Sequence, residues 1–114
     1  MRTEILFNDI DASADATSAV LDVPCAQDMR FIIQVFKTGV DANPIIEVWE
    51  GLSKTGTWTP MQDNVTWEDE FIIDRDSFPI KDSYFMGDQL RLEYKANGVT
   101  TGTIKVVIGY KTKP

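Results

Sequence analysis

Apolar residues in this chain form short runs that alternate with polar residues, and turn-forming residues separate the runs about every 8–12 positions. The clearest case is Gln89–Ala96, where Leu90, Leu92 and Tyr94 alternate with charged residues. A period of two residues predicts β-strands with one buried face. Since no segment keeps a helical period, we expect an all-β protein with little helix.

Eight segments have the length and composition of strands. They are Arg2–Phe7, Thr17–Val23, Arg30–Lys37, Ile45–Glu50, Thr57–Met61, Glu70–Asp74, Gln89–Ala96 and Thr101–Lys111. Both faces of Arg30–Lys37 are largely apolar, which indicates a central strand or one covered on its outer side. We therefore expect a single domain over residues 1–114, an antiparallel β-sandwich (jelly-roll or Ig-like) of roughly seven to nine short strands.

Glycine-containing turns connect these segments. The stretch GLSKTGT at 51–57 looks like a phosphate-binding loop, but Thr57 stands where the motif needs lysine, and strand-forming residues follow instead of a helix. We interpret it as a hairpin turn. Asn97-Gly98 is the strongest hairpin signal and predicts that Thr101–Lys111 returns antiparallel. Asp76–Asp88 contains proline and glycine and is expected to be a long connection with room for one helical turn.

The 114 residues include 11 basic and 18 acidic side chains, a net charge of −7. This charge argues against nucleic acid and against anionic membrane surfaces as partners. No apolar stretch is long enough for a transmembrane helix, and the acidic N-terminal segment predicts no secretion signal. With Cys25 as the single cysteine, no intrachain disulfide is expected, and we predict that its side chain is half-buried packing.

Candidate catalytic groups are few. The chain contains no histidine, so a serine or cysteine nucleophile has no ordinary base. The tripeptide KTG occurs at 37–39 and 54–56, but no serine has lysine three positions later, as β-lactamase-type sites require. The acidic clusters at 63–70 and 74–76 lack the spacing of a calcium loop, and no two carboxylates stand out as a glycosidase pair. We expect no enzymatic activity, no metal and no cofactor.

Three tryptophans, Trp49, Trp58 and Trp67, are regularly spaced along the chain. Exposed tryptophans on a β-sandwich can stack on sugar rings, which makes a carbohydrate-binding module the alternative interpretation. The simpler interpretation places them in the core or at an interface, because aromatic residues supply much of the buried area of small domains. Alternation puts Trp49 on the face opposite Ile46 and Val48, away from the core.

The order of these segments resembles small β-sandwich structural proteins of tailed-phage virions, such as capsid decoration (auxiliary capsid) proteins and head fibres. The similarity runs from TSAVLDVPC through RFIIQVFKTG, IIEVWEGLSKTGTWTPM and LRLEY to TTGTIKVVIGYK, and so covers most of the chain. It includes a Ser-x-x-Gly-x-Trp hairpin, here Ser53, Gly56 and Trp58, and a closing aliphatic strand from Thr103 to Ile108.

The resemblance implies a non-enzymatic virion protein, made in the host cytoplasm, that decorates the capsid or belongs to the head, neck or tail. Its partners would be protein subunits of the same particle, further copies of itself among them, reached through edge strands and aromatic loops by shape complementarity. The residues we expect at such contacts are Trp49, Trp67, Phe78, Tyr84, Phe85 and Met86.

Overall fold

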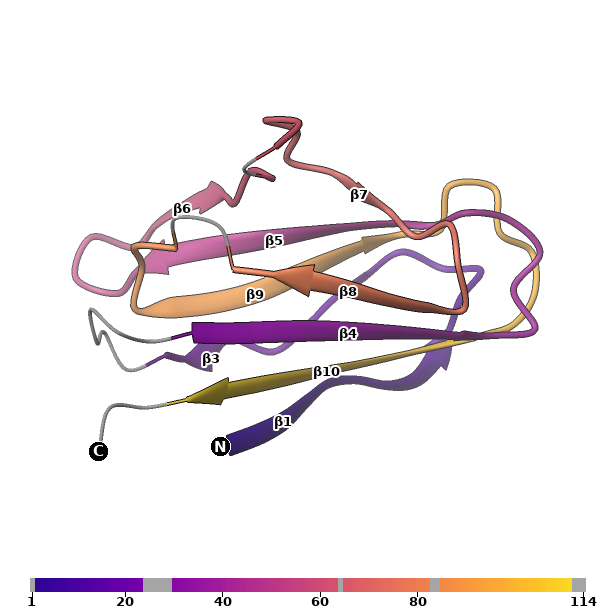
Figure 1. Ribbon diagram of the computed structural model, residues 1–114, viewed down its shortest axis with the longest axis horizontal. Coiled ribbons are helices and arrows are strands. Elements are labelled where there is room, and N and C mark those ends of the chain that lie inside the picture. The colour runs from indigo at the N-terminus through magenta and orange to yellow at the C-terminus, as the bar shows by residue number, and fades with distance from the viewer. Residues whose placement is uncertain (1, 24–29, 64, 83–84, 112–114) are drawn as a thin grey trace.

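The computed structural model describes residues 2–23, 30–63, 65–82 and 85–111, and these residues form ten β-strands and no helix (Figure 1). The strands are β1 (Arg2–Asp11), β2 (Ala16–Thr17), β3 (Leu21–Asp22), β4 (Arg30–Thr38), β5 (Ile45–Leu52), β6 (Thr57–Pro60), β7 (Phe71–Ile72), β8 (Ser77–Lys81), β9 (Gln89–Lys95) and β10 (Thr103–Lys111). None of the described residues belongs to a helix that could cross a membrane. Cys25 lies outside these ranges.

The strands form two antiparallel sheets packed face to face (Figure 1). Sheet A has the order β1-β10-β4-β8. Sheet B has the order β2-β9-β5-β6, with β3 also on β9 and β7 also on β5, so its six strands fill four positions. The connections β1–β2, β3–β4, β4–β5, β7–β8, β8–β9 and β9–β10 each pass from one sheet to the other. Eight positions in two sheets with these crossings make a jelly roll, which decides between the two expected topologies.

One hydrophobic core fills the space between the sheets. In β9, the alternating Leu90, Leu92 and Tyr94 are all buried, as predicted. The Tyr94 hydroxyl donates a hydrogen bond of 2.7 Å to the carbonyl oxygen of Ala12. Burial, with smaller contributions from the charges of Asp15 and Asp11, raises the pKa of Tyr94 to about 12.

The GLSKTGT stretch is confirmed as a β-hairpin. It joins β5 to β6, which pair from Trp49 opposite Pro60 to Leu52 opposite Thr57. The amides of Thr55 and Gly56 donate to the carbonyl of Leu52, and Gly56 has a φ of 69°. A glycine adopts this conformation without steric cost, and the turn has no helix to receive a phosphate.

The hairpin predicted at Asn97-Gly98 is wrong in its pairing. The turn exists, with φ of 51° and 90° and a bond from the Val99 amide to the Ala96 carbonyl. However, β10 pairs with β1 and β4, not with β9. After the turn Val99 is buried and Thr100 bonds the Asp41 carboxylate, so the chain crosses to the other sheet.

Two other predictions are corrected. The segment Asp76–Asp88 contains strand β8, with no helical turn among its described residues, because β4 pairs with residues 77–81 despite Pro79. Backbone bonds from Lys37 to Asp76 and from Asp82 to Phe31 set the alternation of the ladder, which turns the missing Pro79 amide outward. The predicted first strand runs four residues further, to Asp11, because two register shifts let its polar end stay paired with β10.

Features that hinder strand addition occur at every sheet edge. Pro79 removes a donor from the open side of β8, and β1 carries its two register shifts and a positive φ at Asp9. The edges of sheet B are divided between the short strands β2 and β3 and the short strands β6 and β7. Another protein is therefore more easily bound by faces and loops than by an added strand.

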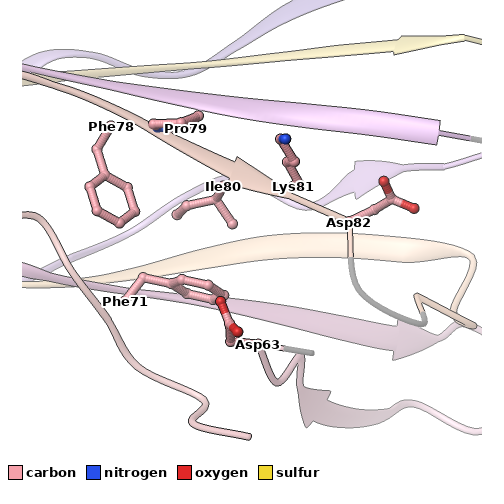
Figure 2. A pocket seen from close by; sticks show the side chains of 7 residues that line it. All are labelled: Asp63, Phe71, Phe78, Pro79, Ile80, Lys81 and Asp82. Atoms are coloured by element: carbon pink, nitrogen blue, oxygen red, sulfur yellow. The ribbon is translucent and has the colours of Figure 1, made fainter. Parts of the chain in front are cut away.

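A pocket of about 330 Å³ opens where the edge strands β7 and β8 of the two sheets face each other (Figure 2). Phe78 and Ile80 point from β8 toward Phe71, and Lys81 points the opposite way. The pocket is lined by Asp63, Phe71, Phe78, Pro79, Ile80, Lys81 and Asp82. The lining therefore combines apolar side chains with charged ones.

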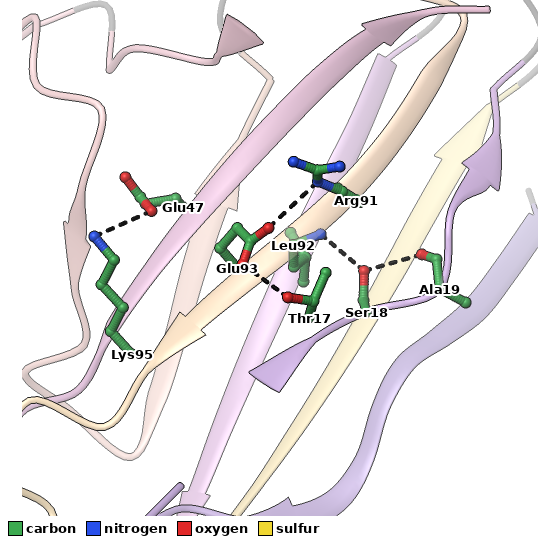
Figure 3. Close-up of polar contacts among 8 residues, drawn as sticks. All are labelled: Thr17, Ser18, Ala19, Glu47, Arg91, Leu92, Glu93 and Lys95. Carbon is green, nitrogen blue, oxygen red and sulfur yellow. Dashed lines mark hydrogen bonds and ion pairs between the residues drawn. The ribbon is translucent and has the colours of Figure 1, made fainter. Parts of the chain in front are cut away.

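Ser18 separates the short strands β2 and β3 and takes over part of their pairing with β9 (Figure 3). Its backbone amide donates to the Leu92 carbonyl at 2.9 Å, and its hydroxyl oxygen accepts a bond of 2.8 Å from the Leu92 amide. The hydroxyl in turn donates to the Ala19 carbonyl at 3.0 Å. A buried hydroxyl thus supplies the acceptor that a continuous strand would have provided.

Replacing Ser18 by alanine should lower the free energy of unfolding by about 1–3 kcal/mol, because the Leu92 amide would be buried without an acceptor. Urea unfolding followed by circular dichroism measures the loss. Ser77→Ala, which changes an exposed serine on β8, is the control and should stay within about 0.5 kcal/mol of the wild type. Equal midpoints for both variants would show that the Leu92 amide finds another acceptor.

Candidate functional site

The segment Val65–Glu70, here named the tryptophan loop, presents two large apolar side chains to solvent. Val65 is 80% exposed and Trp67 is 66% exposed. Asp63 holds the loop from one side, since its carboxylate accepts bonds from the amides of Val65 and Thr66 at 2.7 and 3.1 Å. Its backbone accepts from Trp67 and donates to Glu68, and Trp67 has a positive φ of 62°. The loop is thus a hydrogen-bonded turn that positions an exposed indole.

Two of the other predicted contact residues, Phe85 and Met86, lie in the connection between β8 and β9. Phe85 packs edge-to-face on buried Phe31, with ring centroids 5.3 Å apart, so it covers the core. Met86 is 78% exposed, and its amide donates to the Glu50 carboxylate at 2.9 Å. Tyr84 lies outside the described residues.

Phe78 is half-buried on β8, where it lines the β7–β8 pocket. The guanidinium of Arg75 lies 5.4 Å from its ring centroid. Phe78 and Phe85 therefore both contribute to packing of the sandwich, whereas Met86 and Trp67 project from it.

The other two tryptophans lie on the outer face of sheet B, and Trp49 is on the side opposite Ile46 and Val48, as predicted. The Arg91 guanidinium lies 4.4 Å from the Trp58 ring centroid and 5.6 Å from that of Trp49. A Cβ added at Gly51 would come within 3.0 Å of the Trp58 ring, so that ring has backbone on one side and the arginine on another. Little of the Trp58 ring is free to stack on a ligand.

Ion pairs occupy the rest of the outer face of sheet B (Figure 3). Lys95 Nζ lies 3.3 Å from a carboxylate oxygen of Glu47 and 3.7 Å from one of Glu70. The hydrogen bond with Glu47 is the main cause that raises the pKa of Lys95. Arg91 lies 3.4 Å from Glu93, which also accepts a bond from Thr17. Charges of both signs are therefore paired on this face.

The outer face of sheet A has a different character. The strand register places the outward residues in the middle of the sheet in three rows, which are Thr3–Gly109–Ile32–Lys81, Ile5–Val107–Gln34–Pro79 and Lys105–Phe36–Ser77. These rows, here named the basic-apolar face, contain two lysines and no acidic residue, although the chain carries a net charge of −7. Ile5 is 53% exposed. Acidic Asp9 and Asp11 follow only at the far end of β1.

The sequence indicated an apolar outer side on one strand of this face but did not show which other residues belong to the face. The two apolar sides of Arg30–Lys37 indicated a central strand or one with a cover, and β4 is indeed central in sheet A. Its outward Ile32 and Phe36 lie opposite Gly109 and Lys105 of β10. The sequence had predicted the wrong neighbour for that strand, so it could not align these residues.

Several carboxylates that could have formed a metal site serve to hold turns instead. Asp88 accepts bonds from the hydroxyl and the amide of Ser53, and these bonds lower its pKa. Asp41 accepts the corresponding bonds from Thr100, which lower its pKa in the same way. Within the described residues, no group of three metal-binding side chains comes together.

Comparison with known proteins gives no family model, no curated protein and no solved structure that matches this chain.

Proposed function

We propose that this protein is a non-enzymatic structural protein that acts through protein–protein contacts in a phage particle, as a capsid decoration protein or another head, neck or tail component. The virion assignment is supported by the resemblance in strand order and by the jelly-roll topology. The same topology also occurs in lectins and cupins, so this support is an analogy of fold.

The observation that carries a contact function is the tryptophan loop. Adjacent exposed apolar side chains mark surfaces that bind other molecules. Tryptophan is also enriched among the residues that dominate binding energy. Hydrogen bonds from the Val65 and Thr66 amides to the Asp63 carboxylate fix the turn beforehand, so binding would order few additional groups. Glu68 and Asp69 beside Trp67 would supply the polar rim around an apolar anchor.

The proposal is tested by isolating virus particles from cultures that express the chain and banding them in a density gradient. We expect the chain to band with the particles and Trp67→Ala to reduce its amount at least tenfold, since loss of a buried anchor costs about 2 kcal/mol or more. Leu52→Ala, which truncates an exposed apolar residue on the β5–β6 hairpin, is the matched control. If the wild-type chain stays entirely in the unbound fraction, it is not a particle component.

The second candidate function is carbohydrate binding, which the exposed indole of Trp67 favours. Trp58 and Trp49 offer less, because Arg91 lies against both rings. Titration with a panel of polysaccharides, followed by tryptophan fluorescence, separates the two candidates. We expect no shift, whereas a saturable shift lost in Trp67→Ala would establish a sugar platform and replace the structural proposal.

A further inference from the structure

The tryptophan loop and the basic-apolar face are complementary in character. The loop combines Val65 and Trp67 with acidic Glu68 and Asp69. Another loop acid, Glu70, is already paired with Lys95. The face combines apolar Ile5, Ile32, Phe36 and Val107 with Lys81 and Lys105, and its rows contain no acidic residue. An acidic rim around an apolar anchor matches a basic rim around an apolar surface.

The two surfaces lie on different parts of the molecule. The loop connects β6 to β7 and projects beyond β5 at the top of Figure 1, whereas β1, β10 and β4 lie at the bottom. Both surfaces can therefore be engaged at the same time by two neighbours.

We propose that the tryptophan loop of one copy docks on the basic-apolar face of a second copy of this chain. The inference rests on the proposed structural function and names one of its contacts. Because the two surfaces differ, the contact is head-to-tail and leaves each pair with one free loop and one free face. Repetition of such a contact gives a ring if the rotation closes and a filament if it does not.

A reciprocal contact, in which two copies exchange their Trp67 side chains, is disfavoured by charge. The β7–β8 pocket adjoins the loop through Asp63, and its lining includes Asp63 and Asp82 as well as Lys81. A two-fold arrangement there would bring Glu68 and Asp69 of one copy toward Asp63 and Asp82 of the other. Like charges set against each other disfavour an interface, and the basic-apolar face avoids this.

The test uses two multiple variants of the full chain. The loop variant is Trp67→Ala with Glu68→Gln and Asp69→Asn, and the face variant is Ile5→Asp with Lys105→Glu. The matched control, Val20→Asp with Lys54→Glu, makes the same chemical changes as the face variant at exposed positions outside both surfaces. Circular dichroism and thermal melting establish that each variant folds.

Size-exclusion chromatography with light scattering gives the mass. We expect the wild type and the control to form oligomers that dissociate as salt is raised, because rim charges contribute to the contact. The loop variant and the face variant should each run at the one-chain mass of 12.9 kDa. An equimolar mixture of the two should form dimers and nothing larger. Each pair contains only one intact face and one intact loop, and the dimer contact uses both.

Three results would overturn the inference. They are a wild type that is monomeric at all concentrations, variants that keep the wild-type mass, and a mixture that does not form dimers. A monomeric wild type that still bands with particles would remove self-docking and leave the proposed structural function standing. An oligomeric wild type absent from particles would do the reverse.

Discussion

Gly102→Ala is expected to destabilise the protein by about 3 kcal/mol or more, a large share of the stability of a domain of this size. Gly102 has a φ of 104°, in a region that side chains rarely adopt. A Cβ there would lie 2.6 Å from the Thr38 carbonyl oxygen and 2.7 Å from the backbone of Gly39. Backbone atoms cannot rotate away as a side chain does, so the β9–β10 connection and the end of β4 would have to move apart.

Gly98→Ala is the matched control for this prediction. Gly98 also has a positive φ, of 90°, but an added Cβ would meet nothing within 4 Å. It should therefore cost only the backbone strain, about 1–2 kcal/mol. Urea midpoints at one protein concentration give both values. Equal losses in the two variants would show that the close approach at Gly102 relaxes freely, contrary to our expectation.

Ile33→Ala should lower the free energy of unfolding by about 2–5 kcal/mol, because it opens a cavity in the centre of the core. Ile33 lies on β4 between Ile108 of β10 and Ile80 of β8, and all three side chains are buried. Neighbours held in hydrogen-bonded strands on both sides cannot collapse far into the space. Ile33→Val removes one methylene group and should cost about 0.5–1.5 kcal/mol.

Ile32→Ala, one position earlier on the same strand, separates packing from contact. Ile32 faces outward on the basic-apolar face, so its truncation should cost much less stability in the single chain than Ile33→Ala. The same change should weaken the proposed self-docking in light scattering. If Ile32→Ala were as destabilising as Ile33→Ala, the outer side of β4 would be part of the core and not a contact surface.

Strands with clean alternation could be predicted from the sequence, because a one-sided apolar pattern specifies both the element and its buried face. The prediction for Gln89–Ala96 agrees with β9 to within one residue, and Arg30–Lys37 agrees equally well with β4. Polar or proline-containing strands were harder. Residues 8–11 extend β1 although they read as a turn, and Pro79 is tolerated in β8 because that strand lies at an edge.

The sequence of a turn does not determine which strand the following strand pairs with. Asn97-Gly98 specifies a reversal of direction, but burial of Val99 and the bonds of Thr100 to Asp41 carry the chain into the other sheet. Asp41 is 59 residues distant from Thr100 in sequence, so no local pattern contains this information. The choice between jelly-roll and Ig-like topology depended on the same long-range pairing.

The candidate surfaces could be foreseen in part. Alternation placed Trp49 on the outer side of its strand, but the approach of Arg91 to its ring depends on the pairing of β5 with β9. The basic-apolar face combines residues from β1, β4, β8 and β10, which are far apart in sequence. It became visible only when the register aligned Ile5, Val107 and Gln34 in one row.

Blunted sheet edges have a consequence for how easily copies of this chain separate. Strand addition joins molecules by rows of main-chain hydrogen bonds, and such assemblies tend toward fibrils that rarely come apart. Pro79 in β8 and the register shifts in β1 oppose that route, so association is left to side chains on faces and loops. Contacts of that kind respond to salt and dilution while each domain stays folded. The edge residues thus favour reversible assembly, in which a misplaced copy can leave and bind again.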